Sequence, residues 1–126
     1  METVFDPLRK KDVPLTPEEG VRQAFIEYLH VTGGIPLVRM SSEWPFIYNG
    51  KRYRADIVVF DRNLRPDILV ECKAPSVAID RTVIEQAIRY ARHLKPRIVA
   101  LTNGKTTYGF ILDSSGTNYT PTDCLF

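Results

Sequence analysis

The sequence has few cysteines, no long apolar run and almost no net charge, and each shortage excludes a class of protein. Its two cysteines, Cys72 and Cys124, form neither a CxxC pair nor a disulfide framework. No stretch is long and apolar enough for a membrane span, and no charged-then-apolar leader opens the chain. We therefore expect a cytoplasmic protein with reduced thiols and no membrane attachment.

The charge balance does not identify a binding partner. Lysine and arginine number 17 against 15 aspartate and glutamate, so the formal net charge is +2, as in ordinary soluble globular proteins. Basic residues gather in three stretches, 9–11, 51–54 and 89–97, which are either solvated surface or parts of a basic face. The chain has no GxxxxGK(S/T) loop, so nothing in it indicates a nucleotide-driven motor.

Composition divides the 126 residues into three stretches around one expected domain. Residues 1–15 mix charge, proline and apolar residues without a period, which predicts an extended N-terminal arm. Residues 113–126 are rich in Ser, Thr, Asn and Gly and predict a loosely held polar tail. The domain itself is therefore expected over residues 16–112.

A helix is predicted at the start of this domain. Thr16 suits the N-cap, Pro17 the first helical position, and Glu19 the third residue after the cap, as in a capping box. Gly33 and Gly34 are expected to end the helix. Apolar residues recur on one face at helical spacing: Val21, Ala24, Phe25, Tyr28 and Leu29.

The middle of the chain predicts three antiparallel strands. Residues 35–40 are β-like, and Asn49 with Gly50 is a tight-hairpin signal between alternating residues. A second turn at residues 61–66 returns the chain into another apolar strand. Pro75 is expected to end this third strand, because proline has no backbone donor for the ladder.

A second helix and further strands follow. Either Asp80 or Thr82 can cap a helix that runs to about Leu94. The apolar run at 97–104 then predicts a strand parallel to its neighbour, and the run at 107–113 can add one more. The expected fold is α/β: a helix, three antiparallel strands, a helix and one or two further strands in a mixed sheet.

Three charged residues stand inside or at the end of the apolar strands. Ionised groups are costly there unless they are paired or bind a metal. Glu71 and Lys73 share one face because strand residues alternate. If the turn centres near Asn63 and Leu64, antiparallel pairing places Asp56 opposite Glu71. We therefore expect two carboxylates and one ammonium group on one patch.

This patch has the chemistry of a phosphodiester hydrolase. Two close carboxylates repel each other, and a hard divalent ion such as Mg²⁺ or Mn²⁺ removes the repulsion. Lys73 could orient or deprotonate an attacking water and offset charge on a phosphate. The alternative is structural: Lys73 pairs with Glu71 or Asp56 at the edge of the sheet.

The same residues carry a family resemblance. Asp56 followed by "ECK" at 71–73 resembles the D…(D/E)xK signature of the PD-(D/E)xK nuclease superfamily. Three phrases, "PEEGVRQAFIEYL", "RADIVVFD" and "LVECKAP", resemble the N-terminal nuclease domain of type I restriction enzyme R subunits over about residues 16–110. The resemblance implies a restriction-endonuclease-like core. Alanine, not proline, precedes Asp56 here.

The resemblance also implies roles for individual residues. The two acids, Asp56 and Glu71, would bind the metal together with the main-chain carbonyl of Cys72, and Lys73 would be catalytic. Some branches of the superfamily carry a glutamate on the first helix that assists the metal site. Glu18 and Glu19 are both candidates; Glu18 is preferred, because Glu19 also fits the capping box.

The second helix carries a further match. Gln86 and Tyr90 resemble the QxxxY motif of related nucleases, and residues four apart share one helix face. Tyr90 also lies on the apolar stripe of this helix and can serve in packing, so Gln86 is the better functional candidate.

These features predict a metal-dependent DNA endonuclease domain related to restriction or defence. The alternative is a nucleic-acid-binding or assembly module that has the same fold without catalysis. The small size leaves room for motor or specificity subunits supplied by other chains, and for a homodimer. The residues expected to contact nucleic acid are Arg22, Lys51, Arg52, Arg54, Arg89 and Tyr90.

Overall fold

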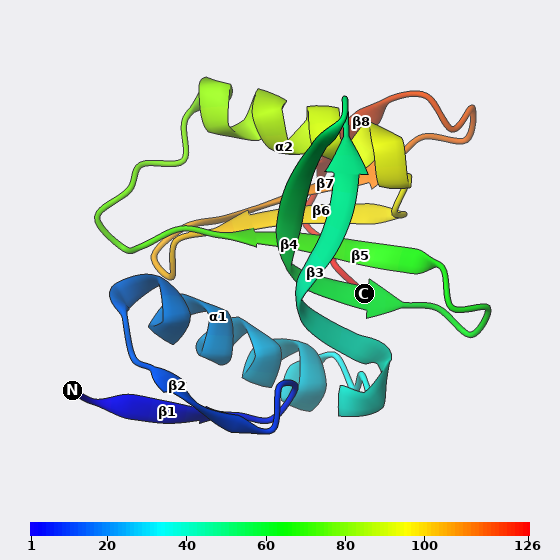
Figure 1. The fold of residues 1–126 in the computed structure, drawn as a ribbon. Helices are drawn as coiled ribbons and strands as arrows, with labels where there is room; N and C mark the ends of the chain where they lie inside the picture. Colours follow the sequence, from blue (N-terminus) through cyan, green and yellow to red (C-terminus); the bar gives the residue numbers. More distant parts are fainter.

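The computed structural model describes all 126 residues and contains two helices packed on a mixed sheet of six strands (Figure 1). The strand order is β3-β4-β5-β6-β7-β8, and every pair is antiparallel except the parallel pair β5–β6. The strands are β3 (Met40–Tyr48), β4 (Lys51–Phe60), β5 (Pro66–Cys72), β6 (Ile98–Thr102), β7 (Thr107–Leu112) and β8 (Tyr119–Thr122). The predicted α/β fold is confirmed, with one more strand than expected.

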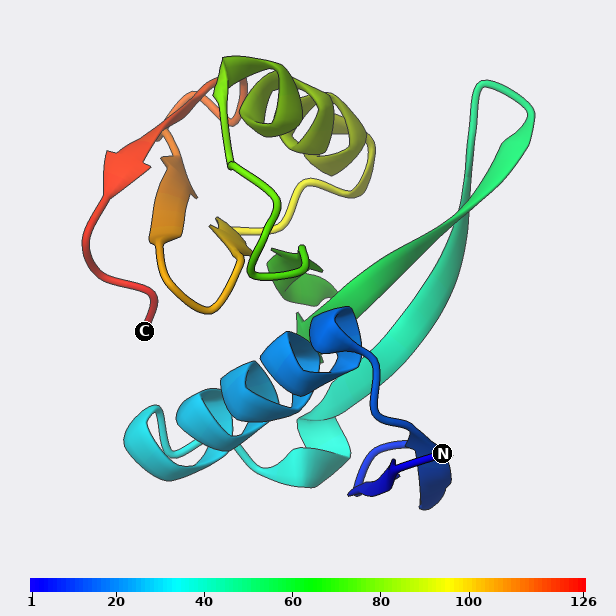
Figure 2. The ribbon, with the colours of Figure 1, turned by 90° about the vertical axis from the view of Figure 1, so that its left-hand side faces the viewer.

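The helices cover opposite faces of the sheet. Helix α1 (Pro17–Glu27) lies on one face and α2 (Arg81–Leu94) on the other (Figures 1 and 2). Each face has its own apolar cluster, and the central strands β4, β5 and β6 contribute to both clusters. Alternate residues of these strands therefore face different helices. Neither helix is long and apolar enough to cross a membrane.

Both helices begin at the caps that the sequence predicts. The Thr16 hydroxyl accepts a hydrogen bond from the Glu19 N–H at 3.1 Å, and the Asp80 carboxylate accepts one from the Val83 N–H at 3.0 Å. Asp80, and not Thr82, is therefore the cap of α2. After α1 the chain continues as a π-helical turn, Tyr28–Thr32.

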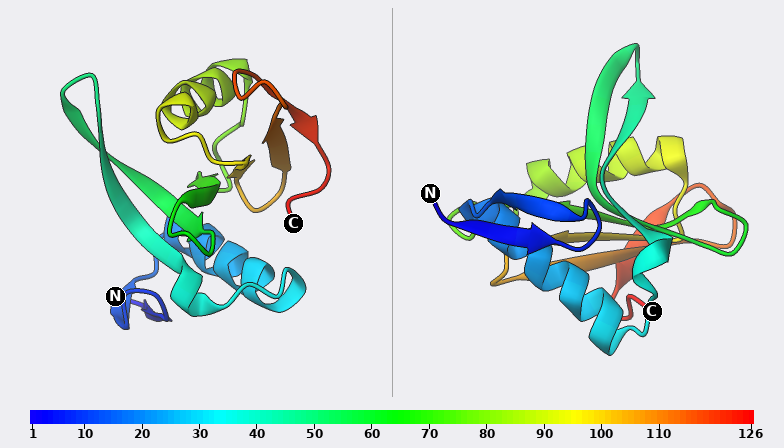
Figure 3. Two further views of the ribbon diagram at one scale, coloured as in Figure 1. Left: turned by 90° about the vertical axis from the view of Figure 1, so that its right-hand side faces the viewer. Right: turned by 60° about the horizontal axis from the view of Figure 1, so that its bottom comes forward.

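The Asn49-Gly50 turn joins β3 and β4 as predicted. Both residues have positive φ, 50° and 75°, as a type I′ turn requires. The two strands form a long arm that extends from the body of the sheet (Figure 3). The prediction of β structure from residue 35 was wrong, because Leu37–Arg39 forms a 3-10 turn and the strand begins at Met40.

The two ends of the chain are more ordered than the sequence suggests. Residues 1–15 contain an antiparallel hairpin of β1 (Thr3–Asp6) and β2 (Lys11–Pro14), which lies beside α1 (Figure 3). The predicted polar tail supplies β8, which pairs with β7. The expected extended arm and loose tail are thus corrected, while the domain limits at 16 and 112 stay a prediction.

Candidate active site

The pairing of β4 with β5 brings the two acids of the site, Asp56 and Glu71, close together. Ile57 and Val70 form the last pair of the β4–β5 ladder, so Asp56 and Glu71 follow directly beyond it, and their side chains lie within hydrogen-bond distance of each other. The Cys72 N–H donates to Asp56 Oδ2 at 2.7 Å. This short bond to a carboxylate fixes the side chain of Asp56 against β5.

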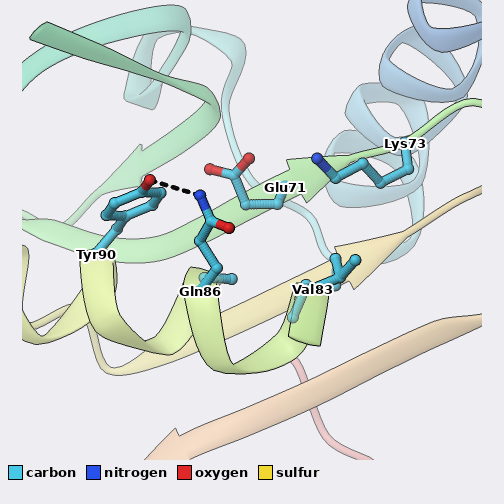
Figure 4. A pocket seen from close by; sticks show the side chains of 7 residues that line it. Glu71, Lys73, Val83, Gln86 and Tyr90 are labelled. Carbon is cyan, nitrogen blue, oxygen red and sulfur yellow. Dashed lines mark hydrogen bonds between the residues drawn. The ribbon is translucent and has the colours of Figure 1, made fainter. Parts of the chain in front are cut away.

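Glu71 and Lys73 face a small cavity beneath α2. The Lys73 ammonium group points toward the Glu71 carboxylate (Figure 4). Its nitrogen nevertheless lies more than 4.0 Å from every carboxylate oxygen, so it forms no ion pair. The structural ion pair considered as an alternative for Lys73 is therefore not present. The cavity measures about 100 Å³ and is lined by Glu71, Lys73, Val83, Gln86, Ala87, Tyr90 and Leu101.

Burial raises the pKa of both acids, and the negative charge of Asp56 raises that of Glu71 further. Burial, followed by the negative charge of Asp56, raises the pKa of Glu71 to about 8. Burial also raises the pKa of Asp56, although the Cys72 N–H and the Arg22 guanidinium act in the opposite direction. Two carboxyls with raised pKa values on adjacent strands form a site that a cation would stabilise.

The first turn of α1 separates the two glutamates that the sequence leaves as alternatives. Glu19 is buried and its carboxylate pairs with Arg9 at 2.7 Å and Arg22 at 3.2 Å. Glu18 is more exposed, and partial burial together with the negative charge of Asp56 raises its pKa. Of these two glutamates, Glu18 is therefore the one whose carboxylate forms no ion pair with an arginine.

Helix α2 closes the other side of the cavity. Gln86 and Tyr90 share one face, as predicted, and Gln86 Nε2 donates to the Tyr90 hydroxyl at 2.6 Å (Figure 4). The Tyr90 ring also packs against the β3–β4 arm, with its centroid 4.6 Å from that of Tyr53. Tyr90 therefore serves both the packing of the arm and the wall of the cavity.

Four of the five cations predicted to contact nucleic acid are exposed, and one is not. Lys51 and Arg52 lie next to the tip of the arm, and Arg54 and Arg89 are also exposed. Arg22 is only 6% exposed, and its guanidinium contacts the carboxylates of Glu19 and Asp56. The prediction that Arg22 contacts a phosphate is therefore corrected.

Sequence reasoning missed Glu43, which faces the site from β3. Its φ of +52° lies in the left-handed region, which is uncommon for a residue other than glycine inside a strand. Its carboxylate lies 3.6–3.7 Å from three guanidinium groups, those of Arg9, Arg22 and Arg54. The one available signal is Pro45, since a proline within a strand indicates an edge or an irregularity.

The donor set suits a hydrated divalent ion. No three His, Cys, Asp or Glu side chains are grouped to hold a metal ion. Mg²⁺ needs only one or two carboxylates and takes its remaining ligands from waters, carbonyls or phosphate. Asp56 and Glu71 supply two carboxylates, so the residues present fit such an ion.

The fold and the acid pair with its neighbouring lysine define a nuclease-like α/β domain. The model of the type I restriction enzyme R protein N terminus (HSDR_N) matches residues 17–125, and the chain belongs to this family.

The fold of the chain is similar to that of a solved structure. A candidate nuclease belonging to DUF820 from Anabaena variabilis ATCC 29413 is similar, with a TM-score of 0.55 and 12% identity. The match covers 96% of this chain and 76% of that chain, and at this identity it shows a shared fold alone. No curated protein matches the sequence.

Proposed function

We propose that this chain is a metal-dependent endodeoxyribonuclease domain that hydrolyses phosphodiester bonds in DNA, in restriction or defence. One observation carries the proposal: Asp56 and Glu71 lie close together just beyond the β4–β5 ladder, and Lys73 lies at the same cavity as Glu71 without an ion-pair partner. Membership of the restriction enzyme family supports it. The fold shared with a candidate nuclease is consistent with the proposal.

Each residue of the proposed site would have its own role. The carboxylates of Asp56 and Glu71 and the main-chain carbonyl of Cys72 would hold Mg²⁺ or Mn²⁺, which supplies positive charge for the phosphate as its negative charge develops. Lys73 would orient the attacking water, and it would either take the proton of this water as a neutral amine or offset the phosphate charge as an ammonium group. Glu18 would assist the metal site from α1, since it is near enough for the charge of Asp56 to raise its pKa.

Helix α2 and the arm would position the substrate. Gln86 has an amide at the wall of the cavity, and its partner Tyr90 offers an aromatic edge to the nucleic acid. Cations along the arm and on α2 would contact backbone phosphates without reading sequence: Lys51, Arg52, Arg54 and Arg89. Motor or specificity subunits in trans, or a second copy of the chain, would supply DNA translocation or sequence choice.

The proposed setting is the cytoplasm. Both cysteines are free, and buried Cys72 has a pKa raised by its burial, as an unreactive structural thiol would have. This fits a reducing compartment where DNA is accessible.

Cleavage of plasmid and single-stranded DNA with Mg²⁺ or Mn²⁺ tests the proposal. We expect the wild-type chain to cut, and Lys73→Ala and Asp56→Asn to cut roughly 100-fold more slowly or not at all. Lys11→Ala and Asp12→Asn are the matched controls, because both residues are exposed on β2 and have no side-chain partner in the structure. These controls should cut as the wild type does.

Two outcomes would contradict the proposal. Cleavage that survives both Lys73→Ala and Asp56→Asn would place the chemistry elsewhere or in a contaminant. DNA binding without cleavage, under either metal and with the partner subunits present, would favour the nucleic-acid-binding module instead.

A further inference from the structure

Arg22 lies buried on α1 directly behind Asp56. Its Nη1 donates to the main-chain carbonyl of Asp56 at 3.4 Å and lies 3.8 Å from Asp56 Oδ1. Its Nε lies 3.2 Å from Glu19 Oε2, and its Nη2 lies 3.7 Å from Glu43 Oε1. A single guanidinium therefore connects α1, β3 and β4 at the acid pair.

The strand ladder is interrupted at Asp56. Neither Asp56 nor Glu43 takes part in the pairing of β3 with β4, which joins only the residues on either side, Ser42 with Ile57 and Trp44 with Ala55. At this interruption Arg22 Nη1 and the Ser42 hydroxyl, the latter at 3.5 Å, donate to the carbonyl of Asp56. The left-handed backbone of Glu43 is strained and persists because its surroundings hold it.

The interruption changes which way β4 presents its side chains. Ala55 packs in the cluster beneath α2, whereas Ile57, two residues further on, packs in the cluster beneath α1. In a regular strand these two residues would face the same side. The direction of Asp56 therefore depends on contacts that maintain the interruption, and not on strand alternation alone.

The N-terminal hairpin joins the same group of charges. Arg9 pairs with Asp6 on its own hairpin, and its two terminal nitrogens reach Glu19 at 2.7 Å and Glu43 at 3.6 Å. The side chain of Asp6 is fully buried. The family match begins at residue 17, so this hairpin lies outside the matched region although it contacts the surroundings of the site.

We propose that Arg22 is a positioning residue for Asp56. Through its contacts with the carbonyl and the carboxylate of Asp56 at the interruption, Arg22 keeps this carboxylate against the Cys72 N–H and in place for the metal. The two glutamates on either side hold Arg22, and the N-terminal hairpin completes the arrangement through Arg9. This inference rests on the proposed function, because it takes Asp56 as an acid of the active site.

The Cys72 amide gives a readout that does not depend on activity. In metal-free Arg22→Gln, we expect hydrogen exchange at the Cys72 amide to accelerate about tenfold, because its bond to the Asp56 carboxylate weakens. Exchange at the Val70 amide, in the same strand, should stay as in the wild type. A merely structural role for Arg22 would accelerate exchange along the whole of β5.

Binding and kinetics extend this test. We expect Arg22→Gln to weaken Mn²⁺ binding about tenfold and to lower kcat with KM unchanged, because phosphate contacts elsewhere are kept. Glu43→Gln is a second variant that should fold readily, since its side chain is 38% exposed, and it should show the same changes to a smaller extent. Arg62→Gln, in the exposed turn after β4, is the matched control and should change nothing.

A folded Arg22→Gln protein whose Cys72 amide exchanges as in the wild type would overturn the positioning role. So would loss of protection at Cys72 and Val70 to the same degree. If the wild type neither binds Mn²⁺ nor cuts DNA, the proposed nuclease function fails, while the comparison of Cys72 with Val70 still decides what Arg22 does.

Discussion

We expect the metal-free protein to lose stability as the pH rises, because of Glu71. Burial and the charge of Asp56 raise the pKa of Glu71 from its ordinary value of 4.5 to about 8. The folded state therefore binds this proton more tightly than the unfolded state does. Its contribution to stability is complete below about pH 4.5 and is lost as the pH rises through 8.

The size of this loss follows from the pKa and from the surroundings of the carboxyl. A rise from 4.5 to about 8 corresponds to about 5 kcal/mol for a fully enclosed group. Glu71 is half-buried and the Lys73 ammonium faces it, so we expect a loss on the order of 1–3 kcal/mol. In a domain of this size that lowers the Tm by roughly 4–12 °C.

Thermal unfolding at pH 5 and pH 9 with a chelator measures the effect. Glu71→Gln should lose less stability over this range than the wild type and should be the more stable protein at pH 9. Mg²⁺ at pH 9 should raise the Tm of the wild type more than that of Glu71→Gln. Glu27→Gln, at an exposed position on α1, is the matched control and should behave as the wild type does. An equal loss in the wild type and in Glu71→Gln would refute the reasoning.

Two further predictions concern the β3–β4 arm. Gly50→Ala should lower the free energy of unfolding in urea by about 1 kcal/mol, because the φ of Gly50 is +75°. Gly20→Ala, inside α1, should be neutral or stabilising by up to about 1 kcal/mol, because its added Cβ would meet only Leu15, at 3.8 Å. Equal stability of the two variants would contradict this. Replacing Lys51 and Arg52 together by alanine should weaken DNA binding and reduce the slope of log K against log salt by about 0.9 for each lost phosphate contact, measured by fluorescence anisotropy. An unchanged slope would show that the tip of the arm does not contact DNA.

Local patterns were enough to predict the acid pair. The register of β4 and β5 depends on the turn between them, where the Asp61 carboxylate accepts bonds from the Asn63 and Arg65 N–H groups. Because the two strands are joined by this short turn, their pairing brings Asp56 close to Glu71, whereas the direction of the Asp56 side chain also depends on the interruption of the β3–β4 ladder. The helix caps were predictable for the same reason, since each cap bonds within its own first turn.

Contacts between distant segments decide what the sequence could not show. The charge of Arg22 favours an exposed position on α1, but Arg22 is buried, and acids from β3 and β4 surround it. Glu43 has a left-handed backbone that no local preference of glutamate predicts. Such positions depend on tertiary partners, and pattern rules for isolated elements do not contain that information.

The ends of the chain were misjudged because polar contacts, not periodicity, order them. In the N-terminal hairpin, the Asp6 side chain accepts from the Leu8 N–H and pairs with Arg9, which shapes the turn between the strands. At the other end, Tyr119 donates from its hydroxyl to the carbonyl of Pro96 at 2.6 Å and ties β8 to the body. Side-chain bonds of this kind leave no alternating apolar pattern to read.

The connectivity of the sheet has a consequence for how the site assembles as the chain folds. β3, β4 and β5 pair through tight turns, so their contacts are close in sequence and can form early. The parallel pairing of β5 with β6 has to wait until the chain has crossed over through α2. We therefore expect the two acids to meet before the wall that carries Gln86 is in place. The carboxylates of a nascent chain would then lie close together without the cover of α2, and we expect the proposed divalent ion to speed folding by reducing their repulsion.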